Sequence, residues 1–216
     1  MKRILVIDIG GNNLKMFATG AREPRRTPSG PEMTAARMVA AVKQITSDWQ
    51  YDYVSIGYPG PAAANRPLRE PVNLAGGWVK YDYEKAFGKP VRMVNDAAMQ
   101  AVGGYEGGRM LFLGLGTGLG SAMMVNGQLV PMELAHLPYR KGKTYEDYLG
   151  DRGRRRLGPK KWAKHVTKVV AMLRAALEVD YVVLGGGNVK KLPKLPPNVC
   201  PGDNSHAFTG GFRLWE

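Results

Sequence analysis

The sequence is poor in cysteine, in acidic residues and in long apolar runs. Cys200 is the only cysteine among the 216 residues, which excludes a disulfide within the chain and a cysteine-rich zinc site. No run of about 18 apolar residues occurs, so we expect no membrane-spanning helix and no membrane partner. Asp8 interrupts the apolar start of the chain, which favours a strand over a signal peptide. We therefore expect a cytoplasmic protein with no structural zinc.

Positive charge is in excess. Thirty-one Lys and Arg residues against 18 Asp and Glu residues give a formal net charge of +13 at pH 7. Such a surface attracts polyanions, and nucleic acid, phosphorylated small molecules and inorganic polyphosphate all qualify. A solvated basic face with no partner is equally compatible with the charge alone. Nucleic-acid binding would weaken steeply with salt, but no aromatic-rich recognition motif supports it, so we do not expect a nucleic-acid partner.

Glycines and prolines separate apolar runs that follow a similar order in the two halves of the chain. The first half predicts strands at 3–9, 14–19, 53–57 and 91–94 with helices at 31–46 and 97–102, and the second half predicts strands at 110–115, 121–125, 129–130 and 181–184 with a long helix over 162–177. We expect an α/β fold of two related lobes, 1–105 and 106–216, with a cleft between them and the last residues packing back on the N-terminal lobe. A single doubly wound sheet is the alternative, and it is disfavoured because the first two glycine turns lead into strands.

Three glycine-rich turns follow expected strands, at 10–11, 116–120 and 185–187. Glycine allows the backbone to approach a ligand closely, and successive N–H groups in such turns bind anions. Each turn alone could be an ordinary hairpin, but three of them in a basic α/β chain favour a phosphate site. The turn at 116–120 is followed by a strand and an Asn126-Gly127 hairpin, which excludes the dinucleotide-binding motif because that motif needs a helix there.

Two aspartates lie where expected strands end. Asp8 precedes the first glycine turn, where a buried carboxylate needs a partner such as a phosphate-bound Mg²⁺ or Lys15 on the return strand. The alternative is a hairpin with a surface Asp–Lys pair. Asp96 lies where a strand meets a helix, so it is either a helix N-cap or a base that accepts the proton of an attacking hydroxyl in phosphoryl transfer.

A third cluster contains Glu133, His136 and Glu146. Carboxylates and an imidazole can bind the hydroxyls of a polyol substrate. No cysteine or second nearby histidine completes a metal site. For His136 alone, a structural histidine is equally compatible with the sequence.

Seven segments occur in the order found in the ROK sugar kinases (repressor, open reading frame, kinase), and the chain resembles that family. They are VIDIGGNNLK (6–15), VSIGYPGP (54–61), NLAGGW (73–78), PVRMVNDA (90–97), LGLGTGLGSAM (113–123), LVPMELAHL (129–137) and VVLGGGNV (182–189). The segments GKTYEDYLG (142–150) and KKWAKHV (160–166) are similar to those of the polyphosphate glucokinases in particular.

The resemblance implies a two-lobed actin-like ATPase fold, which is a duplicated ribonuclease H-like fold. By position, Asp96 would take the proton from the 6-hydroxyl of the sugar, and Asp8 would face Mg²⁺ through water. The sugar would be bound by Asn95, Glu133, His136 and Glu146, and the phosphates by Gly10, Gly11, Asn12, Lys15, Gly116, Thr117, Gly118, Gly185, Gly186 and Gly187.

The implied activity is transfer of a phosphoryl group from ATP, polyphosphate or both to glucose or a related hexose, by a homodimer. The sequence departs from the family at Ala135, where Glu-x-Gly-His is usual, and at Asn12, where Ser or Thr is common. A catalytically silent sugar-binding sensor is the alternative, and retention of Asp8, Lys15 and Asp96 argues against it. The basic stretch 152–168 either follows a long polyanion or forms a solvated helix face.

Overall fold

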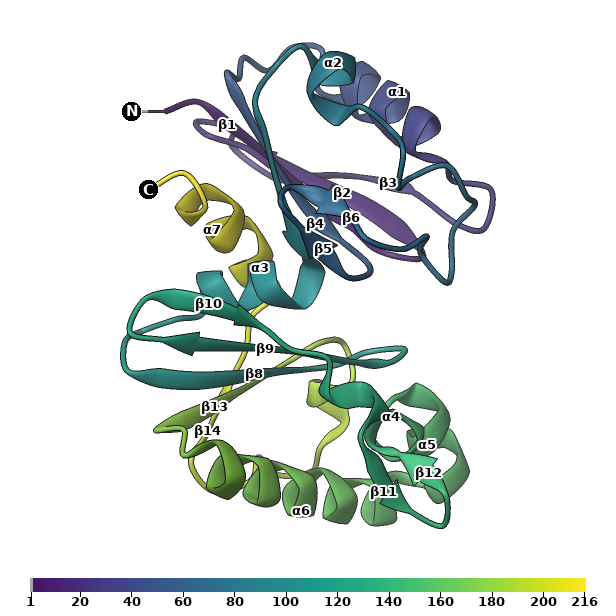
Figure 1. The fold of residues 1–216 in the computed structure, drawn as a ribbon, viewed down its shortest axis with the longest axis vertical. Helices are drawn as coiled ribbons and strands as arrows, with labels where there is room; N and C mark the ends of the chain where they lie inside the picture. The colour runs from purple at the N-terminus through teal and green to yellow at the C-terminus, as the bar shows by residue number, and fades with distance from the viewer. Residues whose placement is uncertain (1) are drawn as a thin grey trace. The chain divides into compact units, whose positions relative to one another are not determined.

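The computed structural model describes residues 2–216 and divides into two compact units. The first unit takes the chain up to Met99 together with Ala207–Glu216, and the second takes Gln100–His206. The C-terminal segment therefore belongs to the first unit, although it is separated from it by more than a hundred residues of sequence. Each unit contains one five-stranded sheet (Figure 1).

The sheet of the first unit has the strand order β3-β2-β1-β4-β7. Its central strand β1 is antiparallel to β2 and parallel to β4, and β4 is parallel to β7. The strands are β1 (Ile4–Ile9), β2 (Asn13–Ala18), β3 (Arg25–Pro28), β4 (Tyr53–Tyr58) and β7 (Val91–Asn95), with a separate pair β5 (Ala62–Ala63) and β6 (Arg66–Pro67). The helices are α1 (Ala35–Ile45), α2 (Tyr83–Phe87), the start of α3 (Asp96–Gly103) and α7 (His206–Arg213).

Side chains of β1 alternate between two hydrophobic clusters. Leu5, Ile7 and Ile9 pack with the buried residues of α1 and α2, whereas Ile4 and Val6 pack with Met99 of α3 and with α7. Both faces of β1 are therefore buried, which explains its continuous apolar run. Figure 1 shows α1 and α2 on one side of this sheet and α7 on the other.

Helix α7 docks directly on β1 and β4. A Cβ atom on Gly211 would lie 2.2 Å from the Cγ1 atom of Val6, so only glycine fits at this contact. The buried hydroxyl of Ser55 on β4 donates a hydrogen bond to the carbonyl of Gly211 and accepts one of 2.8 Å from the Trp215 indole. The C-terminal segment is thus part of the core of the first unit.

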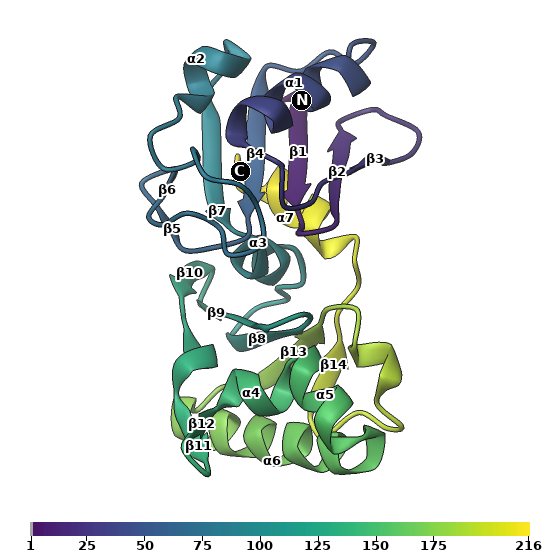
Figure 2. The ribbon, with the colours of Figure 1, turned by 90° about the vertical axis from the view of Figure 1, so that its right-hand side faces the viewer.

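The sheet of the second unit has the strand order β10-β9-β8-β13-β14. The strands are β8 (Arg109–Leu115), β9 (Leu119–Val125), β10 (Gln128–Pro131), β13 (Tyr181–Gly185) and β14 (Val199–Pro201), with a separate pair β11 (Pro138–Arg140) and β12 (Lys143–Thr144). The helices are α4 (Tyr145–Leu149), α5 (Asp151–Leu157) and α6 (Pro159–Leu177), with the 3₁₀ turns η1 (Leu134–His136) and η2 (Val189–Lys191). Figure 2 shows α4, α5 and α6 on the same side of this sheet.

The buried face of α6 covers that side of the second sheet. Trp162 and Val166 of α6 lie in one hydrophobic cluster with Leu111, Leu113 and other residues of β8 and β13. The Trp162 indole donates a hydrogen bond of 2.9 Å to the carbonyl of Leu149 at the end of α4, so its one polar group is satisfied. The helical spacing read from the sequence is confirmed by this packing.

The two sheets share one topology. In each, three antiparallel strands are followed by two strands parallel to the first, β1-β4-β7 and β8-β13-β14. This repetition is the duplicated ribonuclease H-like arrangement of an actin-like ATPase fold, so the predicted fold class is confirmed. The alternative of one doubly wound sheet is wrong. No helix of the described chain combines the length and apolarity needed to cross a bilayer.

We predict that Gly211→Val destabilises the first unit, because the added methyl groups must displace Val6. Overpacking of this kind costs about 1–3 kcal/mol in the free energy of unfolding. Urea denaturation monitored by tryptophan fluorescence measures the change. Gly76→Val is the control, since a Cβ there meets no atom within 4 Å. Equal stability of the two variants would contradict the proposed close contact of α7 with β1.

Candidate active site

The carboxyl ends of the parallel strands β1, β4 and β7 meet at one edge of the first sheet. Asp8 pairs with Gly57 across β1 and β4, and Gly57 pairs with Val94 across β4 and β7. Neighbouring strands lie about 4.8 Å apart, so about 10 Å separates the main chains of β1 and β7 at this level. Asp96 follows Val94 by two residues, which places both predicted aspartates at this edge.

Asp8 is a buried acid, with only 7% of its surface exposed. Its Oδ2 atom lies 3.0 Å from the Nζ atom of Lys15, its partner in the β1–β2 register. The predicted Asp–Lys contact is present, but the carboxylate is not the surface group that the alternative required. Burial of a carboxylate is costly unless a cation balances it, and here Lys15 provides that charge.

Helix α3 approaches β4 closely because residue 57 is glycine. A Cβ atom on Gly57 would lie 2.4 Å from the Met99 Cε atom and 3.5 Å from the Cα atom of Asp96. The start of α3 therefore lies against β4, on the side of the sheet that carries Val6 and α7. Asp8 is two residues after Val6 on β1, so its side chain is on the same side of the sheet as that of Val6.

Asn95, rather than Asp96, caps helix α3. The Asn95 Oδ1 atom accepts hydrogen bonds from the N–H groups of Ala97 and Ala98, at 2.9 and 3.3 Å, and its Nδ2 atom donates one of 3.1 Å to the Gly60 carbonyl. The N-cap interpretation of Asp96 is therefore wrong. Asp96 is the first residue of the helix, where the helix dipole favours the ionised carboxylate, and its Oδ1 atom accepts from the N–H of Ala97 at 2.7 Å.

The first glycine turn joins β1 to β2. The N–H of Gly10 donates to the Asn13 carbonyl at 3.0 Å, and Ser29 closes the turn with hydrogen bonds to the carbonyls of Gly10 and Asn12. The N–H of Gly11 has no hydrogen-bond acceptor among residues 2–216. This turn therefore offers a backbone donor beside the Asp8–Lys15 pair, and the exposed Asn12 side chain adds an amide.

The second and third glycine turns lie together in the second unit. β8 and β13 are parallel, with Gly114 opposite Gly185, so the turns that follow them begin at the same edge. Gly186 has a φ angle of +87°, and a Cβ there would lie 2.5 Å from the Leu115 carbonyl oxygen. Gly187 faces open space. The structure gives the N–H groups of Thr117 and Gly118 no acceptor within residues 2–216, so both turns present backbone to a ligand.

Asn188 joins these two turns and was not anticipated from the sequence. It is buried, its Nδ2 atom donates a 2.9 Å hydrogen bond to the Gly116 carbonyl, and its N–H donates to that of Leu115 at 3.0 Å. Lys191 donates to its Oδ1 atom at 2.9 Å. The polar residue directly after three glycines was the only sequence signal for this role.

The start of α5 and the side chain of Glu146 both contact the second turn. Glu146 Oε2 accepts a 3.1 Å hydrogen bond from the N–H of Leu119 and occupies the space that a Cβ on Gly118 would need. The N–H of Asp151 donates to the carbonyls of Gly116 and Thr117, at 3.1 and 3.2 Å. Glu146 thus lies at the second glycine turn, and its helix begins beside η1, where the N–H of Tyr145 donates to the Leu137 carbonyl at 3.0 Å.

Glu133 and His136 form an exposed pair at η1. The His136 Nε2 atom lies 3.7 Å from the Glu133 Oε1 atom, and 73% of the imidazole side chain is exposed. His136 is therefore an exposed residue and not part of the core. Ala135 between them is buried and does not adopt a positive φ angle, so its methyl group fits without strain.

A magnesium ion fits the edge of the first sheet only if water and substrate phosphates complete its coordination. No group of three or more His, Cys, Asp or Glu residues in the described part of the chain could hold a metal ion by itself. Mg²⁺ commonly uses one or two carboxylates together with water and substrate phosphates. Asp8, beside the first glycine turn, suits that coordination.

The fold is shared with solved structures of ROK family kinases. No family profile matches the chain. Two polyphosphate glucokinases are similar in sequence: one from Mycobacterium tuberculosis (strain CDC 1551 / Oshkosh) is 28% identical over 88% of this chain and 80% of its own length, and one from Mycobacterium leprae (strain TN) is 27% identical over 88% of this chain and 65% of its own length. The resemblance to this group is confirmed.

Two solved structures share the fold. An inorganic polyphosphate/ATP-glucomannokinase from Arthrobacter sp. strain KM has a TM-score of 0.84 at 22% identity, with both chains covered in full. A ROK family glucokinase from Streptomyces griseus, solved with glucose and AMPPNP, has a TM-score of 0.79 at 16% identity, with 98% of each chain covered.

We predict that Asp151→Asn lowers the melting temperature at neutral pH by about 2–4 °C. A hydrogen bond from Arg154 lowers the pKa of Asp151. The ionised carboxylate therefore stabilises the folded chain at pH values above the pKa of about 3.9 that Asp has in the unfolded chain. This stabilisation is lost as the pH falls through the lower pKa of the folded chain. Calorimetry of the variant and the wild type, from neutral pH to below the pKa of the folded chain, measures the difference in melting temperature. Glu32→Gln, at an exposed carboxylate, is the control. If the difference between the two melting temperatures does not narrow below about pH 4, the electrostatic origin of the stabilisation is contradicted.

Proposed function

We propose that the chain is a sugar kinase that transfers a phosphoryl group from polyphosphate or ATP to the 6-hydroxyl of glucose or a related hexose. The observation that carries the proposal is the placement of Asp8, Asp96 and the first glycine turn at one edge of the first sheet. Phosphoryl transfer needs bound phosphates, a divalent cation and a carboxylate that accepts the hydroxyl proton. The similar polyphosphate glucokinases support the substrate class.

Asp96 is the general base of this proposal. Because Asn95 already caps α3, the Asp96 carboxylate is not needed as the helix cap. Its position at the helix N-terminus favours the ionised form, which is the form that accepts a proton. Gly57 lets α3 lie close to β4, since a Cβ there would lie 3.5 Å from the Cα atom of Asp96 and would require the Met99 side chain to move.

The phosphate-binding groups are the backbone amides of the three turns together with Lys15. Lys15 offers a point charge next to the first turn, and its Nζ atom lies 3.0 Å from Asp8 Oδ2. When bound, Mg²⁺ would neutralise phosphate charge, with Asp8 as the carboxylate that faces it. Asn188 holds the second and third turns in a fixed relation, so the donor would meet preorganised amides.

The sugar contacts follow from the exposed polar groups. Glu133 and His136 present a carboxylate and an imidazole to solvent, as hydroxyl recognition requires. Asn95 retains one Nδ2 hydrogen after its bond to Gly60, and Glu146 contributes from the edge of the second turn. Nothing in the described residues favours the silent sensor. The homodimer and the cytoplasmic location stay predictions.

The proposal predicts that the purified chain forms glucose 6-phosphate from glucose with Mg²⁺ and either ATP or polyphosphate. Asp96→Asn should lower kcat by about 10²–10⁴-fold, because it removes the base, while the dissociation constant for glucose changes little. A coupled assay measures turnover and calorimetry measures glucose binding.

Asp52→Asn is the matched control, since Asp52 is exposed and pairs with Arg3. Product formation by neither donor would overturn the proposed activity. Full activity of Asp96→Asn would overturn the assignment of the base.

The basic residues of α5 and α6 support polyphosphate as a donor. Asp151, the first residue of α5, binds the second glycine turn, so the basic stretch starts at a phosphate site. Further along, Lys160, Lys164 and Lys168 are exposed at intervals of four residues and so share one face of α6 over about 12 Å. A chain of phosphates longer than ATP could follow this face.

Replacing Lys160, Lys164 and Lys168 together by glutamine should raise KM for long-chain polyphosphate several-fold and flatten its salt dependence, with ATP kinetics unchanged. Steady-state kinetics with both donors at two salt concentrations measure this. The matched control replaces the exposed Arg37, Lys43 and Lys85 of the first unit. Equal loss with ATP and polyphosphate would contradict a donor-specific path.

A further inference from the structure

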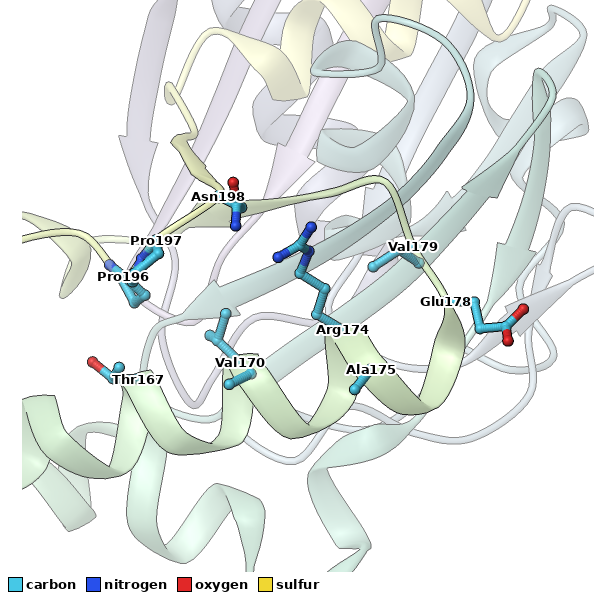
Figure 3. Close-up of a pocket in the computed structure, with 10 residues that line it drawn as sticks. Thr167, Val170, Arg174, Ala175, Glu178, Val179, Pro196, Pro197 and Asn198 are labelled. Carbon is cyan, nitrogen blue, oxygen red and sulfur yellow. The ribbon is translucent and has the colours of Figure 1, made fainter.

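The second unit contains a cavity of about 420 Å³ between α6 and the segment that precedes β14 (Figure 3). Its size is within the range of about 300–1,000 Å³ typical of small-molecule sites. The residues that line it are Thr167, Val170, Ala171, Arg174, Ala175, Glu178, Val179, Pro196, Pro197 and Asn198. None of the glycines of the three turns lines it, so it is separate from the proposed donor site.

The cavity follows from the short connection between two parallel strands. A connection of this type usually contains an α-helix that covers the sheet. Here residues 186–198 contain only the three-residue turn η2, and Pro196 and Pro197 lie over α6 in its place. The C-terminal half of α6 is therefore incompletely covered.

Arg174 supplies the one cationic group of the lining. Its Nε atom is buried and has no hydrogen-bond partner in residues 2–216. A buried donor without an acceptor destabilises the fold, so such a group calls for an explanation. Figure 3 shows the guanidinium reaching from α6 across the cavity toward the strand segment with Asn198.

The acid in the lining, Glu178, does not neutralise this arginine. Glu178 points away from the cavity in Figure 3, and its Oε2 atom lies 3.7 Å from the Nη1 atom of Arg109. The hydroxyl of Thr167 already donates to the Ala163 carbonyl at 3.1 Å. Apart from Asn198, the remaining walls are apolar, with Val170 and Val179 buried in the core of the unit.

We propose that this cavity binds a small organic anion. A carboxylate or phosphate group would accept hydrogen bonds from Arg174, whose planar guanidinium matches both geometries. The apolar body of the ligand would lie against Val170, Val179 and Pro196.

Phenyl phosphate and benzoate are suitable probes, and they distinguish a phosphate from a carboxylate head. In NMR titrations of the full chain we expect shifts at Ala171, Ala175 and Val179, with a dissociation constant of about 1 mM or tighter for at least one probe. Arg174→Gln should weaken binding at least about tenfold. Lys15→Gln should leave it unchanged, because Lys15 belongs to the first unit.

Arg174→Met gives a second readout that does not depend on affinity alone. Replacing an unsatisfied donor by an apolar side chain of similar length should keep or raise the melting temperature of the free protein, and should abolish the rise that the probe causes in the wild type. Arg37→Met, at an exposed helical arginine, is the control.

Three results would overturn the proposal. They are the absence of binding of either probe at about 10 mM, well above the expected constant, unchanged affinity in both Arg174 variants, and shifts confined to the glycine turns. A free Arg174→Met protein that is less stable than the wild type would show that the guanidinium already serves the packing, and would equally refute the premise.

Discussion

The contact of α3 with β4 at Gly57 is the packing constraint on which the proposed chemistry depends. With no side chain at that position, Met99 and the first turn of α3 lie against the sheet, and Asp96 lies at the edge that also carries Asp8. Asn95 caps the helix, so the neighbouring Asp96 is available for the proposed role of general base. An added methyl group at position 57 would require the Met99 side chain, which packs between α3 and β4, to move.

The second unit likewise uses glycine, and in the proposed function the backbone of its turns, instead of side chains, would bind phosphate. Gly186 adopts a left-handed φ angle so that the third turn can pack on Leu115, and Asn188 fastens it to the second turn. Backbone amides held in this way need no reorganisation when an anion binds. The repetition of one sheet topology in both units means that the turns after β1 and β8 are structurally equivalent.

Much of this was predictable, because the informative signals are local. Apolar runs ended by glycine gave the strands of both sheets, and Asn126-Gly127 gave the β9–β10 hairpin, whose two residues have positive φ angles. Helix α7 escaped prediction because Gly210 and Gly211 lower helix propensity, and only docking on β1 makes them necessary.

The short helices α4 and α5 were missed for a related reason, since they are held by a capping box at Thr144 and by contacts with the second turn. Asn188 and Arg174 could not be identified either, because their significance lies in partners that are distant in sequence or absent.

The assignment of α7 to the first unit has a consequence for biosynthesis. The second unit is continuous in sequence, whereas the first lacks the helix that covers one face of β1 until the ribosome has passed residue 213. During translation the second unit can therefore acquire its native core first. Ile4 and Val6 meanwhile lack the partners that the C-terminal segment provides. The core of the first unit can thus be completed only after the whole second unit has been synthesised.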